Sequence, residues 1–582
     1  MNRLSRLLLV PILPVIATAC APDPGGEYDV VVRNGTIYDG TGSDPYVGSV
    51  AIDGDRIVAV GEIGNATGHT EIDATGLAVA PGFVNMLSWA TDSLIVDGRS
   101  QGDIRQGVTL EVFGVGVSYG PLNDAMKAAF VDGWVADAGG EAQVRAMLGL
   151  ADDAPIEVPW TTLGEYLDFL AGKGIAPNVA SFVGATTVRI HEIGYDNRPP
   201  SDEELERMVD LVRQAMREGA LGIGSSLIYA PAFYANTSEL IALNRAVAEY
   251  GGMYISHMRS EGNRLLEAIR ELITIAREAG VPAEIYHLKA AGQDNWGKLN
   301  EAIAMVEAAR AEGLRLTADM YTYTAGSTGL DAAMPPWVQE GGYDDWAKRL
   351  QDPAIRARVK EEMTTPTDEW ENLMLAAGAE GTLLVGFRNQ DLRAAYTGKT
   401  LAVVAAERGS DPADTAMDLV VEDGTRVQVV YFLMSEDNLE RQMRLPWVSF
   451  GSDAGSMAPE LPFTLTSTHP RAYGNFARLL GRYVRDRQVI ALQEAVRKLT
   501  SLPATNLGLE ARGRLAEGFF ADLAIFDPGA ISDHATYEDP HQYSTGMVHV
   551  LVNGALVLHD GEHTGATPGR VLHGPGWSGD TE

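Results

Sequence analysis

The stretch 201-SDEELERMVDLVRQAMREGALGIGSS-226 contains a helical pattern followed directly by a short apolar run. Ser201 and Glu204 have the spacing of a capping box, and the apolar residues after them recur at helical spacing. The run that begins at Ala220 has the length and composition of a buried strand. Further helical patterns follow, each closed by glycine: TSELIALNRAVAEYGG, RLLEAIRELITIAREAG and NEAIAMVEAARAEG. Strands that alternate with helices predict an α/β fold with a parallel sheet.

Eight strand candidates occur along the middle of the chain. They cover residues 78–87, 108–115, 178–184, 220–225, 252–257, 282–287, 314–321 and 447–453. Eight strand–helix units predict a closed (β/α)8 barrel of the TIM type, which we expect to span residues 80–505. Residues 330–446 are too long for a connecting loop and contain helical patterns such as PAIRARVKEEM, so they are expected to form an insertion beside the barrel mouth.

Both ends of the chain have a different character. Residues 28–79 and 506–582 alternate apolar and polar residues around turns such as Asn34-Gly35 and Asp53-Gly54, a pattern typical of β-hairpins. Two β segments that flank a long middle region can pair with each other. We therefore expect a small β-sandwich domain built from both segments.

The overall charge limits the classes of partner. The 582-residue chain has a formal net charge of −34, whereas nucleic-acid binding requires a cationic surface that displaces counterions. The chain contains one cysteine, so no disulfide can form within it. We expect a small-molecule substrate and no nucleic-acid partner.

The first 20 residues match an export signal. Arg3 and Arg6 precede the apolar run 7–19, which is too short to span a bilayer, and small residues lead into Cys20. This arrangement resembles a lipoprotein signal peptide with Cys20 as the acylated first residue of the mature chain. Ala17 stands where a leucine is usual, so cleavage as a plain signal peptide is the alternative. We expect a periplasmic protein that contacts the membrane through a lipid anchor.

Metal-ligating side chains occur at the ends of three predicted strands. His257, His287 and Asp453 each lie where a parallel barrel places its catalytic groups. Imidazole and carboxylate suit Zn²⁺, and a carboxylate beside a metal-activated water can move its proton. The alternatives are histidines that serve only as hydrogen-bonding groups and a Gly-Ser-Asp sequence that caps a helix. Finding all three at strand ends favours a metal site.

Several motifs carry a family resemblance. SHMRSEGNRLLEAI, HLKAAGQDNWGKLNEAI, TADMYTYTAGSTGL, GSDAGS and HPRAYGNFARLLGRYV resemble the N-acyl-D-amino-acid deacylases (D-aminoacylases) of the amidohydrolase superfamily. The likeness runs from about Tyr28 to Gly574. It implies a (β/α)8 barrel, a β-sandwich built from both termini, and hydrolysis of an amide bond at a zinc centre.

The resemblance assigns a role to six residues. It implies that His257 and His287 bind zinc, and that Asp453 acts as base toward water and as acid toward the leaving amine. It also implies that three side chains hold the carboxylate of an N-acyl amino acid: Lys289, Tyr321 and Arg471. Two cations and a phenol suit such an anion. The preference for the D-configuration is implied by the resemblance alone.

The chain departs from the family pattern at the first two strands. The family's His-x-His after the first strand reads Leu87-Ser88-Trp89 here, and Val115 stands where a ligand is expected after the second strand. Glu111 is near in sequence, but its side chain need not point inward. The remaining ligand set is His257, His287 and Asp453, which predicts one zinc ion at most.

Three functions are consistent with these residues. The leading hypothesis is a metal-dependent hydrolase that cleaves the amide of N-acyl, D-configured amino acids or related small amides. The second is a metal-independent hydrolase that uses Asp453 with His257 and His287, and in which Trp89 stacks on the substrate. The third is a catalytically silent barrel that binds acylated peptides or cell-wall fragments.

Overall fold

A computed structural model describes residues 26–138, 140–151 and 153–579. The predicted signal peptide, with Cys20, lies outside these ranges. Within them, no helix is both long enough and apolar enough to cross a bilayer.

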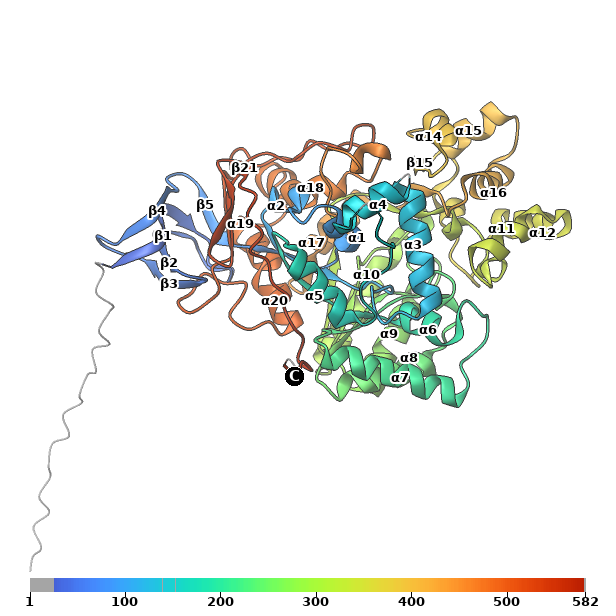
Figure 1. Ribbon diagram of the computed structural model, residues 1–582, viewed down its shortest axis with the longest axis horizontal. Helices are drawn as coiled ribbons and strands as arrows, with labels where there is room; N and C mark the ends of the chain where they lie inside the picture. Colours follow the sequence, from blue (N-terminus) through green and yellow to red (C-terminus); the bar gives the residue numbers. More distant parts are fainter. Residues whose placement is uncertain (1–25, 139, 152, 580–582) are drawn as a thin grey trace, which may run out of the picture.

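Strands from both ends of the chain form one nine-stranded sheet. Its hydrogen-bonded order is β21-β20-β19-β18-β5-β1-β2-β3, and β4 pairs with β1. The bounds are β1 Glu27–Ile37, β2 Tyr46–Asp53, β3 Arg56–Gly61, β4 Thr67–Asp73, β5 Ala78–Pro81, β18 Leu523–Phe526, β19 Met547–Val552, β20 Ala555–His559 and β21 Glu562–His563. The antiparallel pairing of β5 with β18 joins the two segments, and Figure 1 shows them together at one end of the molecule. This confirms the predicted β domain built from both termini.

The middle of the chain forms the predicted parallel barrel. Its strands are β6 Phe83–Asn85, β7 Val108–Phe113, β8 Asn178–Ser181 with β9 Val183–Gly184, β10 Gly222–Ser226, β11 Met253–His257, β12 Ala283–Ile285, β13 Leu316–Met320 and β17 Val448–Phe450. Neighbouring strands pair in parallel from β6 to β8 and from β9 to β17. The ring closes where the Met86 N–H donates to the Phe450 carbonyl over 3.3 Å and where Ser88 pairs with Ala454.

Helices cover the outside of the barrel. Those before the insertion are α1 Ala90–Val96, α2 Gln101–Ile104, α3 Asp124–Ala138, α4 Glu141–Leu148, α5 Leu163–Lys173, α6 Ala185–Ile193, α7 Asp202–Arg217, α8 Thr237–Ala248, α9 Leu265–Ala279 and α10 Leu299–Ala311. After it come α17 Glu436–Met443, α18 Arg471–Arg478, α19 Leu492–Leu499 and α20 Ser501–Leu507. The Ser201–Glu204 capping box predicted for α7 is formed, and its apolar face, with Met208, Val212 and Met216, is buried.

The first predicted strand, 78–87, is divided in the structure. β5 belongs to the terminal sheet and β6 to the barrel, and the chain changes sheet at Gly82, whose N–H donates to the Asp522 carbonyl over 2.8 Å. A Cβ atom at Gly82 would lie 2.1 Å from the Thr109 side chain. A continuous apolar run therefore conceals a crossing between two sheets.

The insertion has its own sheet and core. β14 Ala325–Gly329, β15 Thr382–Gly386 and β16 Gln428–Phe432 form an antiparallel sheet, so the extra structure begins five residues before the predicted boundary at 330. Its helices are α11 Tyr343–Gln351, α12 Pro353–Thr364, α13 Leu373–Ala377, α14 Gln390–Tyr396, α15 Leu401–Arg408 and α16 Pro412–Asp423. Figure 1 shows most of these helices at the end of the molecule farthest from β1–β4.

Candidate active site

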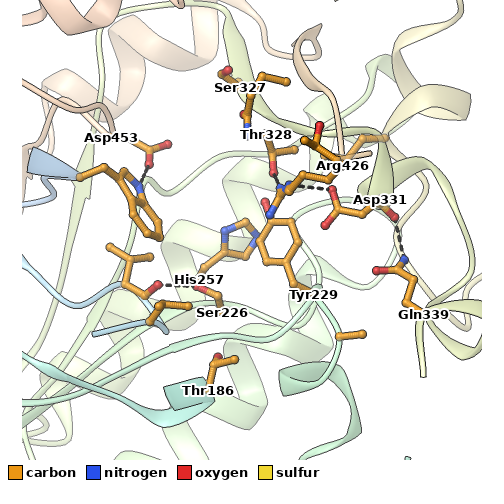
Figure 2. Close-up of a pocket in the computed structure, with 18 of the residues that line it drawn as sticks. Thr186, Ser226, Tyr229, His257, Ser327, Thr328, Asp331, Gln339, Arg426 and Asp453 are labelled. Carbon is orange, nitrogen blue, oxygen red and sulfur yellow. Dashed lines mark hydrogen bonds and ion pairs between the residues drawn. The ribbon is translucent and has the colours of Figure 1, made fainter. Parts of the chain in front are cut away.

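A cavity of about 880 Å³ lies at the carboxyl ends of the barrel strands. Barrel residues line one side and insertion residues the other, and Figure 2 shows His257, Asp453 and Arg426 around the same space. All six residues assigned to the site from the sequence line it: His257, His287, Lys289, Tyr321, Asp453 and Arg471. Strand ends far apart in the chain therefore converge as a parallel barrel requires.

Two histidines and a glutamate form a compact group in the cavity. His257 ends β11, His287 follows β12, and Glu261 lies in the irregular segment after β11. One ligand atom from each lies within 4.8 Å of those of the other two, and all three side chains are buried. The His287 Nδ1 to Glu261 Oε1 distance is 2.8 Å, and the two imidazole rings are nearly perpendicular, at 86°.

The hydrogen bonding and protonation of His257, His287 and Glu261 suit a divalent cation. His257 Nε2 is buried and has no hydrogen-bond partner among the described residues. Burial lowers the pKa of His257 and of His287 to about 3, so both rings are neutral at pH 7 and present lone pairs. Neutral imidazoles with an adjacent carboxylate are the donors that zinc prefers. The residues present therefore fit one metal ion.

Hydrogen bonds from outside the group fix its orientation. Lys289 Nζ donates to Glu261 Oε1 over 2.7 Å and lies 2.7 Å from His287 Nδ1. The backbone N–H of His287 donates to Asp319 Oδ1 over 2.8 Å. This bond holds His287 at a φ of +35°, a left-handed conformation that non-glycine residues rarely adopt. Glu371, from the insertion, accepts the Glu261 N–H over 2.6 Å. The insertion thus helps to position Glu261.

Asp453 lies beside this group rather than within it. Its Oδ1 accepts the indole N–H of Trp89 over 2.9 Å, and its Oδ2 is 2.8 Å from Arg471 Nη1. The backbone at Asp453 has a φ of +52°, and the turn is fixed by a bond of 2.8 Å from the Ser452 N–H to Asn85 Oδ1. The turn does not cap a helix, and its role as a metal ligand remains a prediction.

Lys289, Tyr321 and Arg471 form a cationic corner next to Asp453. The Lys289 ammonium lies 5.5 Å and the Arg471 guanidinium 4.5 Å from the centre of the Tyr321 ring. Arg471 is 3% exposed, and its Nε has no hydrogen-bond partner among the described residues. A buried guanidinium with an unused N–H is suited to receive an anionic group.

The insertion forms the opposite wall. Arg426 Nε lies 3.1 Å from Asp331 Oδ1, and its guanidinium is 5.2 Å from the centre of the Tyr229 ring. The Tyr229 ring meets the His257 ring edge-on at 5.4 Å. Figure 2 shows Arg426, Asp331 and Tyr229 together on this side of the pocket. The space beyond the metal-ligand group therefore ends at an ion pair supplied by the insertion.

Three other residues considered from the sequence have structural settings. Glu111 is fully buried and contacts Asn85 and Ser100 outside the cavity, while Val115 lines the cavity without a ligand atom. His469 faces the cavity, and its Nδ1 accepts the Arg471 N–H over 3.0 Å. Sequence reasoning missed Glu261, although it lies within the motif SHMRSEGN, four residues after His257.

Comparison with known proteins agrees with this geometry. The amidohydrolase family model matches residues 127–558, and the chain belongs to this family. It is 33% identical over 546 residues to a D-aminoacylase of Alcaligenes xylosoxydans xylosoxydans, covering 94% of this chain and 97% of that protein.

Two solved structures are similar over 94% of this chain and 100% of their own, each with a TM-score of 0.75. One, 30% identical, is a D-aminoacylase described by one-metal activation and second-metal attenuation of its binuclear centre. The other, 28% identical, is the N-acyl-D-glutamate deacylase of Bordetella bronchiseptica with zinc and a phosphonate mimic of the tetrahedral intermediate.

Proposed function

We propose that this chain is a metal-dependent amidohydrolase that hydrolyses the amide bond of N-acyl-D-amino acids. The observation that carries the proposal is the joint placement, in one cavity, of a metal-ligand group, a carboxylate and a cationic corner. The relatives support the substrate class, because they are a D-aminoacylase and an N-acyl-D-glutamate deacylase. The relatives do not favour the metal-independent and silent alternatives, because they are named as deacylases and one was solved with zinc.

Zinc would be held by His257, His287 and Glu261, with Asp453 alongside. A bound divalent cation supplies a Lewis acid that polarises an amide carbonyl and makes water easier to deprotonate. Zinc is the preferred ion because two neutral imidazoles and one carboxylate match its usual donors. A relative whose structure was solved in complex with zinc supports the same choice.

The chain's own residues supply binding and proton transfer. Arg471, Lys289 and Tyr321 bind the α-carboxylate, which places the scissile amide between Asp453 and the metal-ligand group. Asp453 accepts a proton from water through a carboxylate oxygen as the water oxygen bonds to the acyl carbon, and it returns the proton to the amide nitrogen as the carbon–nitrogen bond breaks. The Asp453–Arg471 contact of 2.8 Å keeps this carboxylate oriented until substrate enters.

A substrate screen with metal-loaded protein tests the proposal. Paired N-acetyl-D- and N-acetyl-L-amino acids are incubated with enzyme, and the free amino acid is quantified. We expect release from D-substrates, lost in Asp453→Asn and retained in Asp345→Asn, which changes a half-exposed carboxylate outside the catalytic group. Metal-loaded, folded protein that releases no amino acid from either series contradicts the proposed function.

A further inference from the structure

The indole of Trp89 lies on the side of the site where His-x-His is replaced by Leu87-Ser88-Trp89. We infer that Trp89 takes over part of the role of a second metal ion: its N–H orients Asp453, and its ring makes the site a single-metal centre that resists a second ion. The inference rests on the proposed function and deepens it.

The backbone of Trp89 is fixed to the turn that carries Asp453. The Trp89 N–H donates to the Ala454 carbonyl over 3.0 Å, and Ser88 pairs with Ala454 in a parallel bridge. In the reverse direction the Asp453 N–H donates to the Leu87 carbonyl over 2.9 Å. The backbone segments that carry the Trp89 indole and the Asp453 carboxylate are therefore hydrogen-bonded to each other where the barrel closes.

Both oxygens of Asp453 are engaged by protein donors. Trp89 Nε1 lies 2.9 Å from Oδ1, and Arg471 Nη1 lies 2.8 Å from Oδ2. Because an indole N–H can only donate, its bond fixes Oδ1 as an acceptor and fixes the plane of the carboxylate. A second cation would therefore have to compete with these donors for the oxygens of Asp453.

No other described residues on this side supply a ligand set. Leu87 is fully buried and apolar, and Val115 has no donor atom. Among the described residues that line the cavity, one group of three His, Cys, Asp or Glu side chains has ligand atoms within 4.8 Å of one another: His257, Glu261 and His287. Both ring nitrogens of His469 are used, by the Ala325 carbonyl and the Arg471 N–H.

This arrangement has a chemical consequence. A related D-aminoacylase is described by activation with one metal and attenuation with a second. In the present chain Trp89 replaces the second histidine of that sequence pattern, lines the cavity and already donates to Asp453. The enzyme therefore holds one ion and keeps its activity when divalent metal is in excess.

The first experiment counts metal without any substrate. Three proteins are compared: wild type, Leu87→His/Trp89→His and the control Trp577→Phe. Each is equilibrated with excess zinc, freed of unbound metal and analysed for zinc per chain. Trp577 is a suitable control because it is an exposed tryptophan outside the cavity. We expect one ion in wild type and control, and an increase toward two in the double variant. If the replacement of the buried Leu87 prevents the double variant from folding, the single variant Trp89→His is used in its place. Two ions in wild type, or one in a folded variant, overturns the inference.

The second experiment tests positioning. Trp89→Phe keeps an aromatic ring and removes the N–H, so kcat should fall by about ten-fold or more while KM and the melting temperature match those of Trp577→Phe. A kcat equal to that of the control overturns the positioning role. The zinc count needs no turnover, so its result stands even if the proposed substrate class is wrong. Absence of zinc from wild type would instead contradict the proposed function itself.

Discussion

Tyr321→Phe removes one oxygen from the cationic corner and leaves the packing of the ring in place. The hydroxyl makes a weak bond of 3.8 Å to the Met434 sulfur and also interacts with the Arg471 guanidinium, so its loss alters only the corner that faces the substrate. Burial raises the pKa of Tyr321, which keeps the phenol protonated and able to donate to a carboxylate. A hydrogen bond to a charged group contributes about 1.5–3 kcal/mol, which corresponds to roughly 10- to 150-fold in kcat/KM.

The assay compares an N-acetyl-D-amino acid with its primary amide, which lacks the anionic carboxylate. We expect Tyr321→Phe to lower kcat/KM by roughly 10- to 150-fold for the acid and by much less for the amide. Tyr323→Phe is the matched control, since its hydroxyl donates to the Pro470 carbonyl and it does not line the cavity. Equal losses on acid and amide, or no loss on either, would refute the carboxylate role of Tyr321.

Three other changes test separate parts of the account. Glu261→Gln should weaken zinc binding by roughly 10- to 100-fold, measured by competition with a chromogenic chelator, and an unchanged affinity would remove Glu261 from the ligand group. Burial raises the pKa of Glu284 to about 7 from an unfolded value of 4.5, so the native state binds more protons between these values. The contribution of Glu284 to stability is therefore fully present below pH 4.5 and is lost as pH rises through about 7. Glu284→Gln should reduce this loss by about 1–3 kcal/mol in urea titrations at pH 4.5 and 8, whereas an identical pH dependence in both proteins would contradict it. Cys20→Ala should abolish incorporation of a labelled fatty acid into the protein, and equal incorporation in wild type and variant would argue against a lipid anchor at Cys20.

The fold was largely predictable because its signals are local. The capping box at Ser201 and the strand–helix alternation depend on residues close in sequence, and a parallel barrel places its strand ends at one edge. His257, His287 and Asp453 could therefore be assigned to one cavity from their positions alone. The sheet change at Gly82 was not predictable, because the close approach that excludes a side chain there involves Thr109, which is distant in sequence.

The details of the site depend on contacts between distant residues. Glu261 lies in an irregular segment, where no periodicity indicates which way a side chain points. The Trp89–Asp453 bond joins residues 364 positions apart, and only the closed barrel brings them together. Glu111 shows that an acidic residue can be near the site in sequence and still not reach it, because its side chain faces a buried hydrogen-bond network instead of the cavity.

The zinc content of the purified protein tests the central claim most directly. We expect about one zinc ion per chain in wild type and none in His257→Ala/His287→Ala, measured by elemental analysis on folded samples of both. Zinc retained in the double variant, or absent from wild type after exposure to the metal, would contradict a catalytic centre built on His257, Glu261 and His287.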